Sequence, residues 1–71
     1  MLAVVDTGEK LKRERRAAGL PQVELAGRSG VAQSTIAQIE GGVRKNPHPR
    51  TLKRLSEALD VEARELLPDV D

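Results

Sequence analysis

The stretch GVAQSTIAQIEGG, residues 30–42, has no charged side chain from Val31 to Ile39, although 32% of the chain is Asp, Glu, Lys or Arg. Its apolar residues recur at helical spacing and two glycines end it, so we predict a helix over residues 32–40. At 3.6 residues per turn, Ile36 and Ile39 point to one side, while glutamine, serine and alanine side chains point to the other. An ordinary solvated face would carry pairs of Lys and Glu, so this neutral outer face requires an explanation.

Two explanations fit the neutral face. In the first, it enters the major groove of DNA, where Gln can pair with adenine, Ser and Thr can donate or accept hydrogen bonds, and Ala can touch the thymine methyl group. In the second, it is buried against another helix or a second subunit, where small neutral side chains are also favoured. The face alone does not distinguish the two.

Helix-breaking residues divide the rest of the chain into short segments, and none alternates with the period of two that half-buried strands require. We therefore predict an all-α fold with five short helices. Thr7 is expected to cap the first helix and Pro68 to end the last. The predicted ranges are 8–18, 21–28, 32–40, 49 or 50 to 59, and 61–67.

The composition restricts the class of protein. A chain of 71 residues can form one small domain with a core that is only just sufficient. It has no Cys, which excludes disulfides and thiolate metal sites and fits a reducing cytosol, and no aromatic residue on which single-stranded nucleic acid could stack. The apolar start MLAVV runs directly into Asp6 and is too short for a membrane span or a secretory signal. We expect a soluble, cytoplasmic protein with no membrane partner.

Charge is unevenly distributed along the chain, although the net charge is only +1. Residues 1–50 carry nine Lys or Arg and five Asp or Glu, a balance of +4, whereas residues 51–71 carry three and six, a balance of −3. A basic first part suits a bound polyanion, although solvated helix faces produce similar numbers.

The segment QVELAGRSGVAQSTIAQIE, residues 22–40, resembles the helix-turn-helix of the lambdoid phage repressor and xenobiotic response element family. Gly30 matches the turn glycine, and the likeness extends to GLPQ, residues 19–22, and to TLKRLSEALDVEARELL, residues 51–67. It implies a lambda-repressor-like DNA-binding domain over residues 8–67, between an arm at 1–7 and a tail at 68–71. Further positions that match the family are Leu25 and Ala26, where the two helices meet, and Ile36 and Ile39, which point inward.

The resemblance also implies roles for single residues, with double-stranded DNA as the partner. Gln22 would contact a phosphate and lean toward Gln33, and Arg15 and Glu40 would form a structural pair that orients the recognition helix. Base contacts are implied for Gln33, Ser34 and Gln38, with van der Waals or phosphate contacts from Ala32 and Thr35, and DNA backbone contacts for Gln22, Gly42, Arg44, Lys45 and Asn46.

The chain departs from the family pattern at several positions. Pro21 and Ala32 stand where relatives have a Ser or Thr cap, and each missing cap could forgo about 1 kcal/mol. Gly41 replaces a longer polar side chain, so one phosphate contact is expected to be absent. The loop GVRKNPHPRTL, residues 42–52, is one residue longer than the commonest form, which leaves the placement of Arg44, Lys45 and His48 open.

No combination of residues indicates catalysis. His48 is the only histidine and lies between two prolines, where we expect a loop residue or a helix cap. The chain has no set of metal ligands and no glycine-rich phosphate loop. We predict no enzymatic activity, no cofactor and no bound metal.

The resulting prediction is a sequence-specific, double-stranded DNA-binding transcriptional regulator, preferentially a repressor, that works as a homodimer on a two-fold-related site. The dimer surface is expected around Pro49 and in the last helix with Leu66, Leu67 and Val70, and Leu2, Val4 and Val5 could add an arm. Two alternatives stay open. One is an antitoxin or similar protein that also binds a protein partner through the tail EARELLPDVD or the arm MLAVV, and the other is a helical interaction module that has lost DNA binding.

Overall fold

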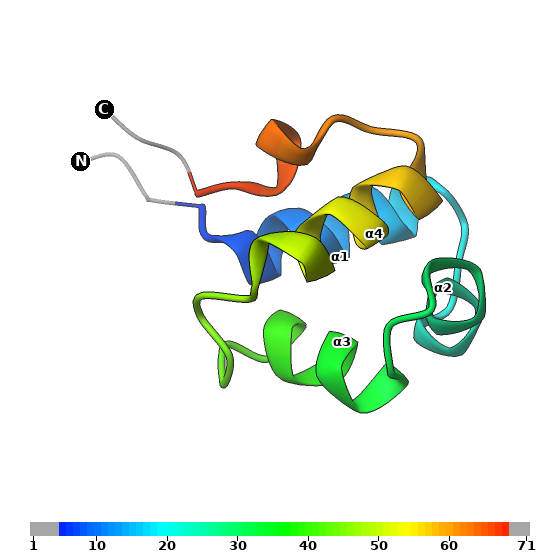
Figure 1. Ribbon diagram of the computed structural model, residues 1–71, viewed down its shortest axis with the longest axis horizontal. Helices are drawn as coiled ribbons and strands as arrows, with labels where there is room; N and C mark the ends of the chain where they lie inside the picture. The colour runs from blue at the N-terminus through cyan, green and yellow to red at the C-terminus, as the bar shows by residue number, and fades with distance from the viewer. Residues whose placement is uncertain (1–4, 69–71) are drawn as a thin grey trace.

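The computed structural model describes residues 5–68 and confirms the all-α fold (Figure 1). Its four α-helices are α1 (Thr7–Ala17), α2 (Gln22–Ser29), α3 (Gln33–Glu40) and α4 (Pro49–Leu59). A short 3-10 helix, η1 (Ala63–Leu66), follows α4. Residues 5–68 contain no β-strand, and none of their helices is long and apolar enough to cross a lipid bilayer.

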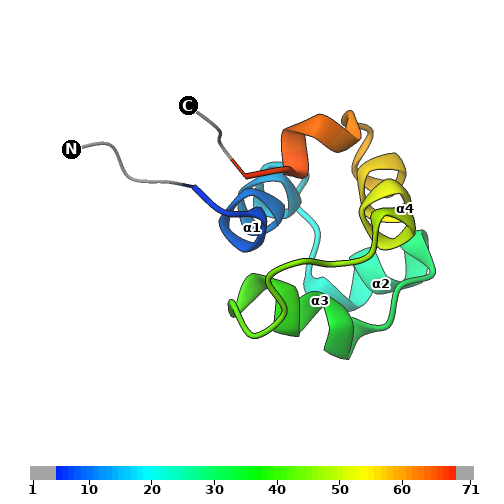
Figure 2. The same cartoon turned by 60° about the vertical axis from the view of Figure 1, so that its left-hand side comes forward.

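The helices and η1 surround one apolar core (Figure 2). Helix α1 packs against α3 and η1, α2 packs against α3 and α4, and α4 packs against η1. Helices α1 and α2 and the η1 turn each bury one leucine in the core, whereas α3 buries two isoleucines and α4 three leucines at helical spacing. Its buried residues are Leu11, Leu25, Val31, Ile36, Ile39, Leu52, Leu55, Leu59 and Leu66.

The last predicted α-helix, over residues 61–67, is wrong: the chain forms one 3-10 turn there. Asp60 ends α4 with a left-handed φ of 58°, and the side chains and backbone of Glu62 and Glu65 cap each other across the turn. Pro68 disfavours helical backbone at the residue before it, and Leu67 is extended with ψ of 151°. A single turn is what fits between these two interruptions.

The start of α1 also differs from the prediction. Asp6, rather than Thr7, is the N-cap, and its side chain accepts a hydrogen bond from the Glu9 N–H at 2.9 Å. A carboxylate at this position satisfies a free helix N–H and interacts favourably with the helix dipole. Thr7 is instead the first residue of α1 and is buried.

The other helix ends lie within one residue of the predicted positions, with Pro21 and Ala32 as N-caps and not as first helical residues. Neither Pro21 nor Ala32 makes a side-chain capping hydrogen bond, so α2 and α3 lack the usual caps. Gly30 has a φ of 74°, the left-handed conformation that lets the chain turn sharply between these helices. His48 is a helix cap: its Nδ1 accepts a hydrogen bond from the Arg50 N–H at 3.0 Å at the start of α4.

Candidate nucleic-acid interface

The two sides of α3 have opposite environments. Ile36 and Ile39 are 0% and 1% exposed and lie in the core. Among residues 5–68 no other helix covers the outer face, so burial within the domain does not explain its neutrality. The exposed residues are Ala32, Gln33, Ser34, Ala37 and Gln38, with Thr35 half-buried beside them.

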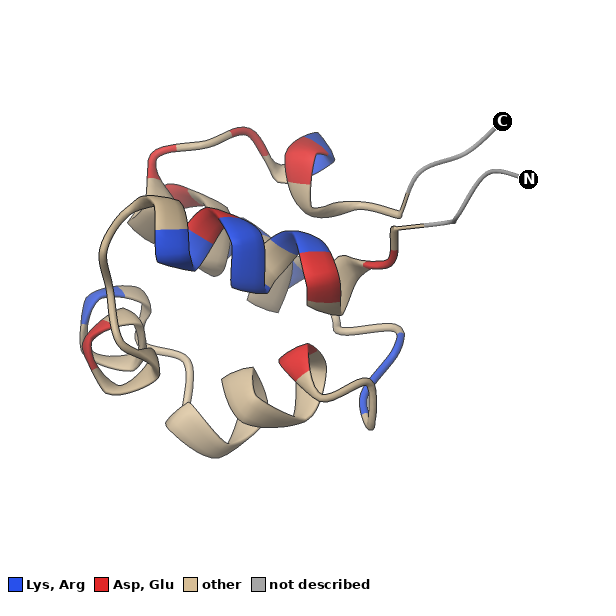
Figure 3. Ribbon diagram, turned by 180° about the vertical axis from the view of Figure 1, so that it is seen from behind, with Lys and Arg blue, Asp and Glu red and all other residues tan. Residues whose placement is uncertain are grey.

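A basic loop adjoins the carboxyl end of this neutral face. Gly42 has a φ of 80°, and the chain turns back so that the N–H groups of Val43 and Arg44 both donate to the Gln38 carbonyl oxygen, at 2.9 and 3.0 Å. Arg44, Lys45 and Asn46 are exposed. Figure 3 shows α3 without Lys or Arg, one acidic position near its end, and basic residues in the loop beyond. Cations therefore lie at the edge of the neutral face and not within it.

Arg15 and Glu40 form a bidentate ion pair between α1 and the end of α3. Arg15 Nε and Nη2 donate to the two Glu40 carboxylate oxygens at 2.7 and 2.9 Å, and Nη1 donates to the Leu20 carbonyl oxygen at 2.8 Å. The side chains of Arg15 and Glu40 are 12% and 3% exposed. The structure thus forms the pair that the family resemblance implied. Through Leu20 the same guanidinium also holds the turn before α2.

The pair is charged at neutral pH. Burial raises the pKa of the Glu40 carboxyl, but hydrogen bonds from Arg15 and Gln22 and the charges of Arg15 and Lys12 together outweigh it, so the pKa lies below its ordinary value of 4.5. The hydrogen bond to Glu40 raises the pKa of Arg15 by more than burial lowers it. Both groups are therefore charged when they form the ion pair between the two helices at neutral pH.

Gln22 does not lean toward Gln33 as the resemblance implied. Its Nε2 donates to Glu40 Oε1 at 3.1 Å, and no hydrogen bond joins the two glutamines in this part of the chain. A buried carboxylate needs donors for its remaining lone pairs, and the start of α2 supplies one. Glu40 is thus held by α1 and α2 together, a cluster that the sequence analysis did not anticipate.

Gly8 has a role in the site that was not predicted from the sequence. A Cβ built on Gly8 would collide with the carbonyl oxygen of Ile39, so the first turn of α1 and the last turn of α3 touch backbone to backbone. No sequence signal marks this contact, because a helix-opening glycine is ordinary. The contact sets the position of the end of α3 relative to α1.

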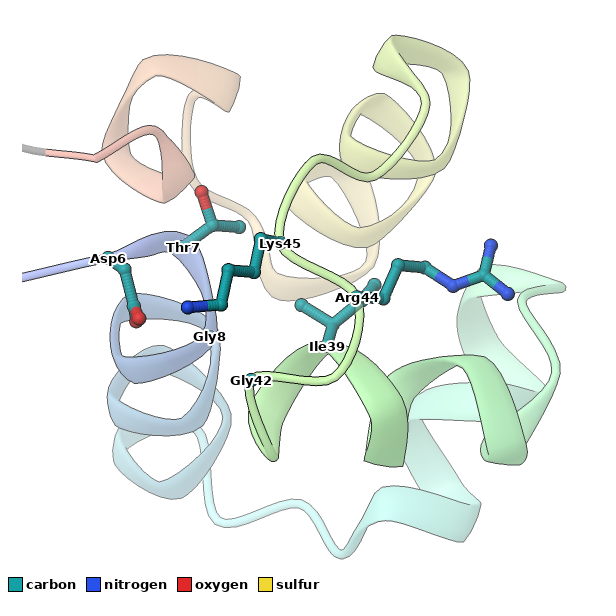
Figure 4. A pocket seen from close by; sticks show the side chains of 7 residues that line it. All are labelled: Asp6, Thr7, Gly8, Ile39, Gly42, Arg44 and Lys45. Carbon is teal, nitrogen blue, oxygen red and sulfur yellow. The ribbon is translucent and has the colours of Figure 1, made fainter.

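A cavity of about 140 Å³ lies between the start of α1 and the loop after α3 (Figure 4). It is well below the roughly 300 Å³ at which sites for organic cofactors begin. Among the described residues no group of His, Asp or Glu could hold a metal ion. The residues that line the cavity are Asp6, Thr7, Gly8, Ile39, Gly42, Arg44 and Lys45.

Comparison with known families shows that residues 11–66 match the model of the helix-turn-helix family. The chain belongs to this family. Helices α2 and α3, joined by the Gly30 turn, are its helix-turn-helix, and the exposed outer face of α3 is the outer face of the second helix of that motif.

Individual members of the helix-turn-helix family are also similar. The regulator RghRB of Bacillus subtilis, named an uncharacterized transcriptional regulator, is 40% identical over 84% of this chain and 43% of its own. The restriction-modification controller protein C.AhdI of Aeromonas hydrophila is 40% identical, with a TM-score of 0.82 over 89% of this chain and 94% of its own. SinR, a master regulator for biofilm formation solved in complex with DNA, is 35% identical, with a TM-score of 0.82 over 84% and 95% of the two chains.

Several of these relatives and neighbours are longer than this chain. The helix-turn-helix chain spans about half the length of the first curated relatives that it matches. The same fold also occurs inside an enzyme, Streptomyces albus HEPD, at 33% identity and a TM-score of 0.84, but this chain covers only 15% of that protein. The likeness to the enzyme therefore concerns one domain.

Proposed function

We propose that this protein binds double-stranded DNA sequence-specifically and regulates transcription by placing α3 in the major groove. The observation that carries the proposal is the exposed, neutral face of α3 with a basic loop at its edge. Neutral hydrogen-bonding side chains can approach base edges, while Arg and Lys hold the phosphates on either side of a groove.

The residues divide into two kinds of contact. We assign the base-edge contacts to Gln33, Ser34 and Gln38, with Ala32 and Thr35 beside them at the start of α3. The sugar-phosphate backbone is assigned to Gln22, Gly42, Arg44, Lys45 and Asn46. In this proposal Arg15 and Glu40 do not touch DNA. They fix the orientation of α3 relative to α1.

Repression by occupying an operator is the mode that we favour. The domain is small, and much of its surface outside the proposed DNA contacts belongs to helices. A protein of this kind can block polymerase simply by occupying the DNA, without an effector site. Support comes from RghR of Bacillus subtilis, a transcriptional repressor that is 43% identical over 76% of this chain and 40% of its own. We assign no catalytic activity, and the cytoplasmic location expected from the sequence goes with this proposal.

The test is selection of binding sites from random double-stranded DNA, followed by affinity measurements on the selected and scrambled sequences. A shared selected sequence, bound at least about 1,000-fold more tightly than scrambled DNA, is the expected result. Cooperative thermal unfolding shows that the protein used is folded. If such protein binds all sequences with equal affinity, sequence-specific regulation is contradicted.

We further propose that the protein acts as a dimer on DNA, because one short recognition helix reads few base pairs and two half-sites one helical turn apart restore specificity. Leu66 has to be removed from the expected dimer surface, since it is 0% exposed in the core. Leu67, at 45% exposed, and Pro49 are available, while Val70, Leu2 and Val4 lie outside the described residues. Sedimentation with and without a selected site tests this: two chains per two-fold-symmetric site are expected, and one chain on an asymmetric site would contradict it.

A second candidate function, binding of a protein partner, is favoured by exposed apolar side chains. Val23 and Val43 are 61% and 79% exposed. This chain is also 36% identical, with a TM-score of 0.82, to a chain in a structure of the SinR protein in complex with the SinI protein. An antitoxin would bind a protein partner as well as an operator. A module without DNA binding would bind the protein partner only. Unaltered gel mobility with every genomic fragment tried would favour the module without DNA binding.

A further inference from the structure

Gln38, on the exposed face of α3, is held by a side chain from the loop that follows the helix. Arg44 Nη2 donates a hydrogen bond to Gln38 Oε1 at 3.1 Å. A guanidinium group can only donate, so the atom that it contacts is the amide oxygen and the amide nitrogen is turned away. The contact therefore selects one of the two orientations of the Gln38 amide.

The backbone brings Arg44 to this place. The N–H groups of Val43 and Arg44 both donate to the main-chain carbonyl oxygen of Gln38, and the left-handed Gly42 makes that return possible. Arg44 is thus tied by its backbone to the same residue that its side chain contacts. Because the loop already holds the two residues together, the side-chain pair forms with a smaller loss of conformational freedom than two unconnected side chains would suffer.

We propose that Arg44 is a positioning residue for base recognition and that it makes Gln38 prefer guanine to adenine. This rests on the proposed function. A free Gln side chain pairs with adenine by donating to N7 and accepting from N6. The amide oxygen has two lone pairs, and one of them already accepts from the guanidinium, so an adenine N6 amino group must use the other lone pair beside a second donor group. The amide NH₂ group has no such competitor and remains free for the N7 and O6 acceptors of guanine.

Lys45 provides a matched control in the same loop. Figure 4 shows the two basic side chains leaving the loop in opposite directions, Lys45 toward Asp6 at the start of α1 and Arg44 away from it. Both residues are exposed. Alanine at either position removes one positive charge from the loop, but only Arg44→Ala releases the Gln38 amide.

The experiment begins with a site selected from random double-stranded DNA. The position that Gln38 reads is the one at which Gln38→Ala relaxes base preference. Affinities for the four bases at that position are then measured by fluorescence anisotropy for the unchanged protein, Arg44→Ala and Lys45→Ala. We expect guanine to be preferred by the unchanged protein, the guanine-to-adenine affinity ratio to fall about three-fold or more in Arg44→Ala, and Lys45→Ala to weaken all four sites equally.

Several results would overturn the inference while leaving DNA binding intact: adenine preferred by the unchanged protein, or the same uniform loss in both variants. The double variant Arg44→Ala with Gln38→Ala is expected to have the same guanine-to-adenine affinity ratio as Gln38→Ala alone, because Arg44 then has no amide to orient. A further change in that ratio would show that Arg44 reads a base itself and would overturn its positioning role. Absence of DNA binding by cooperatively folded protein would instead refute the proposed function and this inference together.

Discussion

Gly8 in α1 lies so close to Ile39 in α3 that a Cβ on Gly8 would collide with the Ile39 carbonyl oxygen. The neighbouring atoms are backbone, so no flexible side chain can move aside. Helix α3 is therefore placed against α1 at a distance that only glycine permits. Together with the Arg15–Glu40 pair, this contact holds the end of α3 against α1 at two points.

Gly8→Ala is expected to lower the free energy of unfolding by about 1 to 3 kcal/mol, because either α1 or α3 must shift to admit the methyl group. Urea unfolding measures the change. Gly27→Ala is the matched control: Gly27 lies within α2 with nothing within 4 Å of its added Cβ, and alanine there should stabilise by about 0.5 to 1 kcal/mol. Stabilisation by both substitutions would show that α1 and α3 are not in backbone contact.

Arg15→Met is expected to destabilise the domain by about 3 to 5 kcal/mol, because it leaves the Glu40 carboxylate buried without its counter-charge. The control is Arg28→Met, which removes an exposed pair with Glu24 within α2 and should cost at most about 0.5 kcal/mol. Adding Glu40→Gln to Arg15→Met should recover part of the loss. Equal small effects of Arg15→Met and Arg28→Met in thermal and urea unfolding would contradict a buried pair.

Acid should remove the contribution of Glu40 to stability. Its pKa in the folded protein lies below the ordinary value of 4.5, so the unfolded state binds the proton more readily. The contribution is complete above about pH 4.5 and is lost as the pH falls through the lower, folded-state pKa. We expect Glu40→Gln to be less stable than the unchanged protein at pH 7, with the difference narrowing below pH 4.5, and Glu24→Gln to show little difference at either pH. A constant difference across this range would argue against the lowered pKa.

Lys45→Ala is expected to weaken binding to all DNA sequences alike and to lower the slope of log K against log salt by about one unit, because one phosphate contact and its counterion release are lost. Arg64→Ala is a control of equal charge. Arg64 lies in η1, on the opposite side of the molecule from α3 in Figures 1 and 3, and its removal should leave the slope unchanged. Loss on one sequence only would instead show that Lys45 reads bases.

Gln33→Ala and Gln38→Ala should each cost about 1 to 3 kcal/mol on the selected site, relax preference at one base position, and leave binding to scrambled DNA nearly intact. Gln22→Ala provides the contrast: it should weaken all sequences similarly and also cost stability, because Gln22 donates to Glu40. Competition binding on selected and scrambled sites separates these effects. If Gln33→Ala lowers the affinity for selected and scrambled DNA equally, the Gln33 side chain contacts the DNA backbone and not a base.

Local sequence patterns were sufficient to predict the helical segments and the neutral outer face of α3. Spacing of apolar residues, glycines at the turns and prolines at helix ends depend on residues within one or two turns of each other, so they can be read locally. That is why the α2 and α3 segments, the turn at Gly30 and the inward isoleucines were predicted correctly, and why a helix cap was one of the two roles expected for His48. The family resemblance added the Arg15 and Glu40 pair, which no local pattern would have indicated.

Contacts between residues far apart in the sequence could not be predicted in this way, because they depend on how the helices pack. Gln22 turns to Glu40 because the buried carboxylate needs a donor, and Leu66 enters the core because one turn after α4 carries it back onto the helices. The contact of Gly8 with Ile39 and the hold of Arg44 on Gln38 depend on the position of whole helices and on the path of the loop between them. Such contacts join groups whose separation is set by packing the entire core, and short-range propensities carry no information about it.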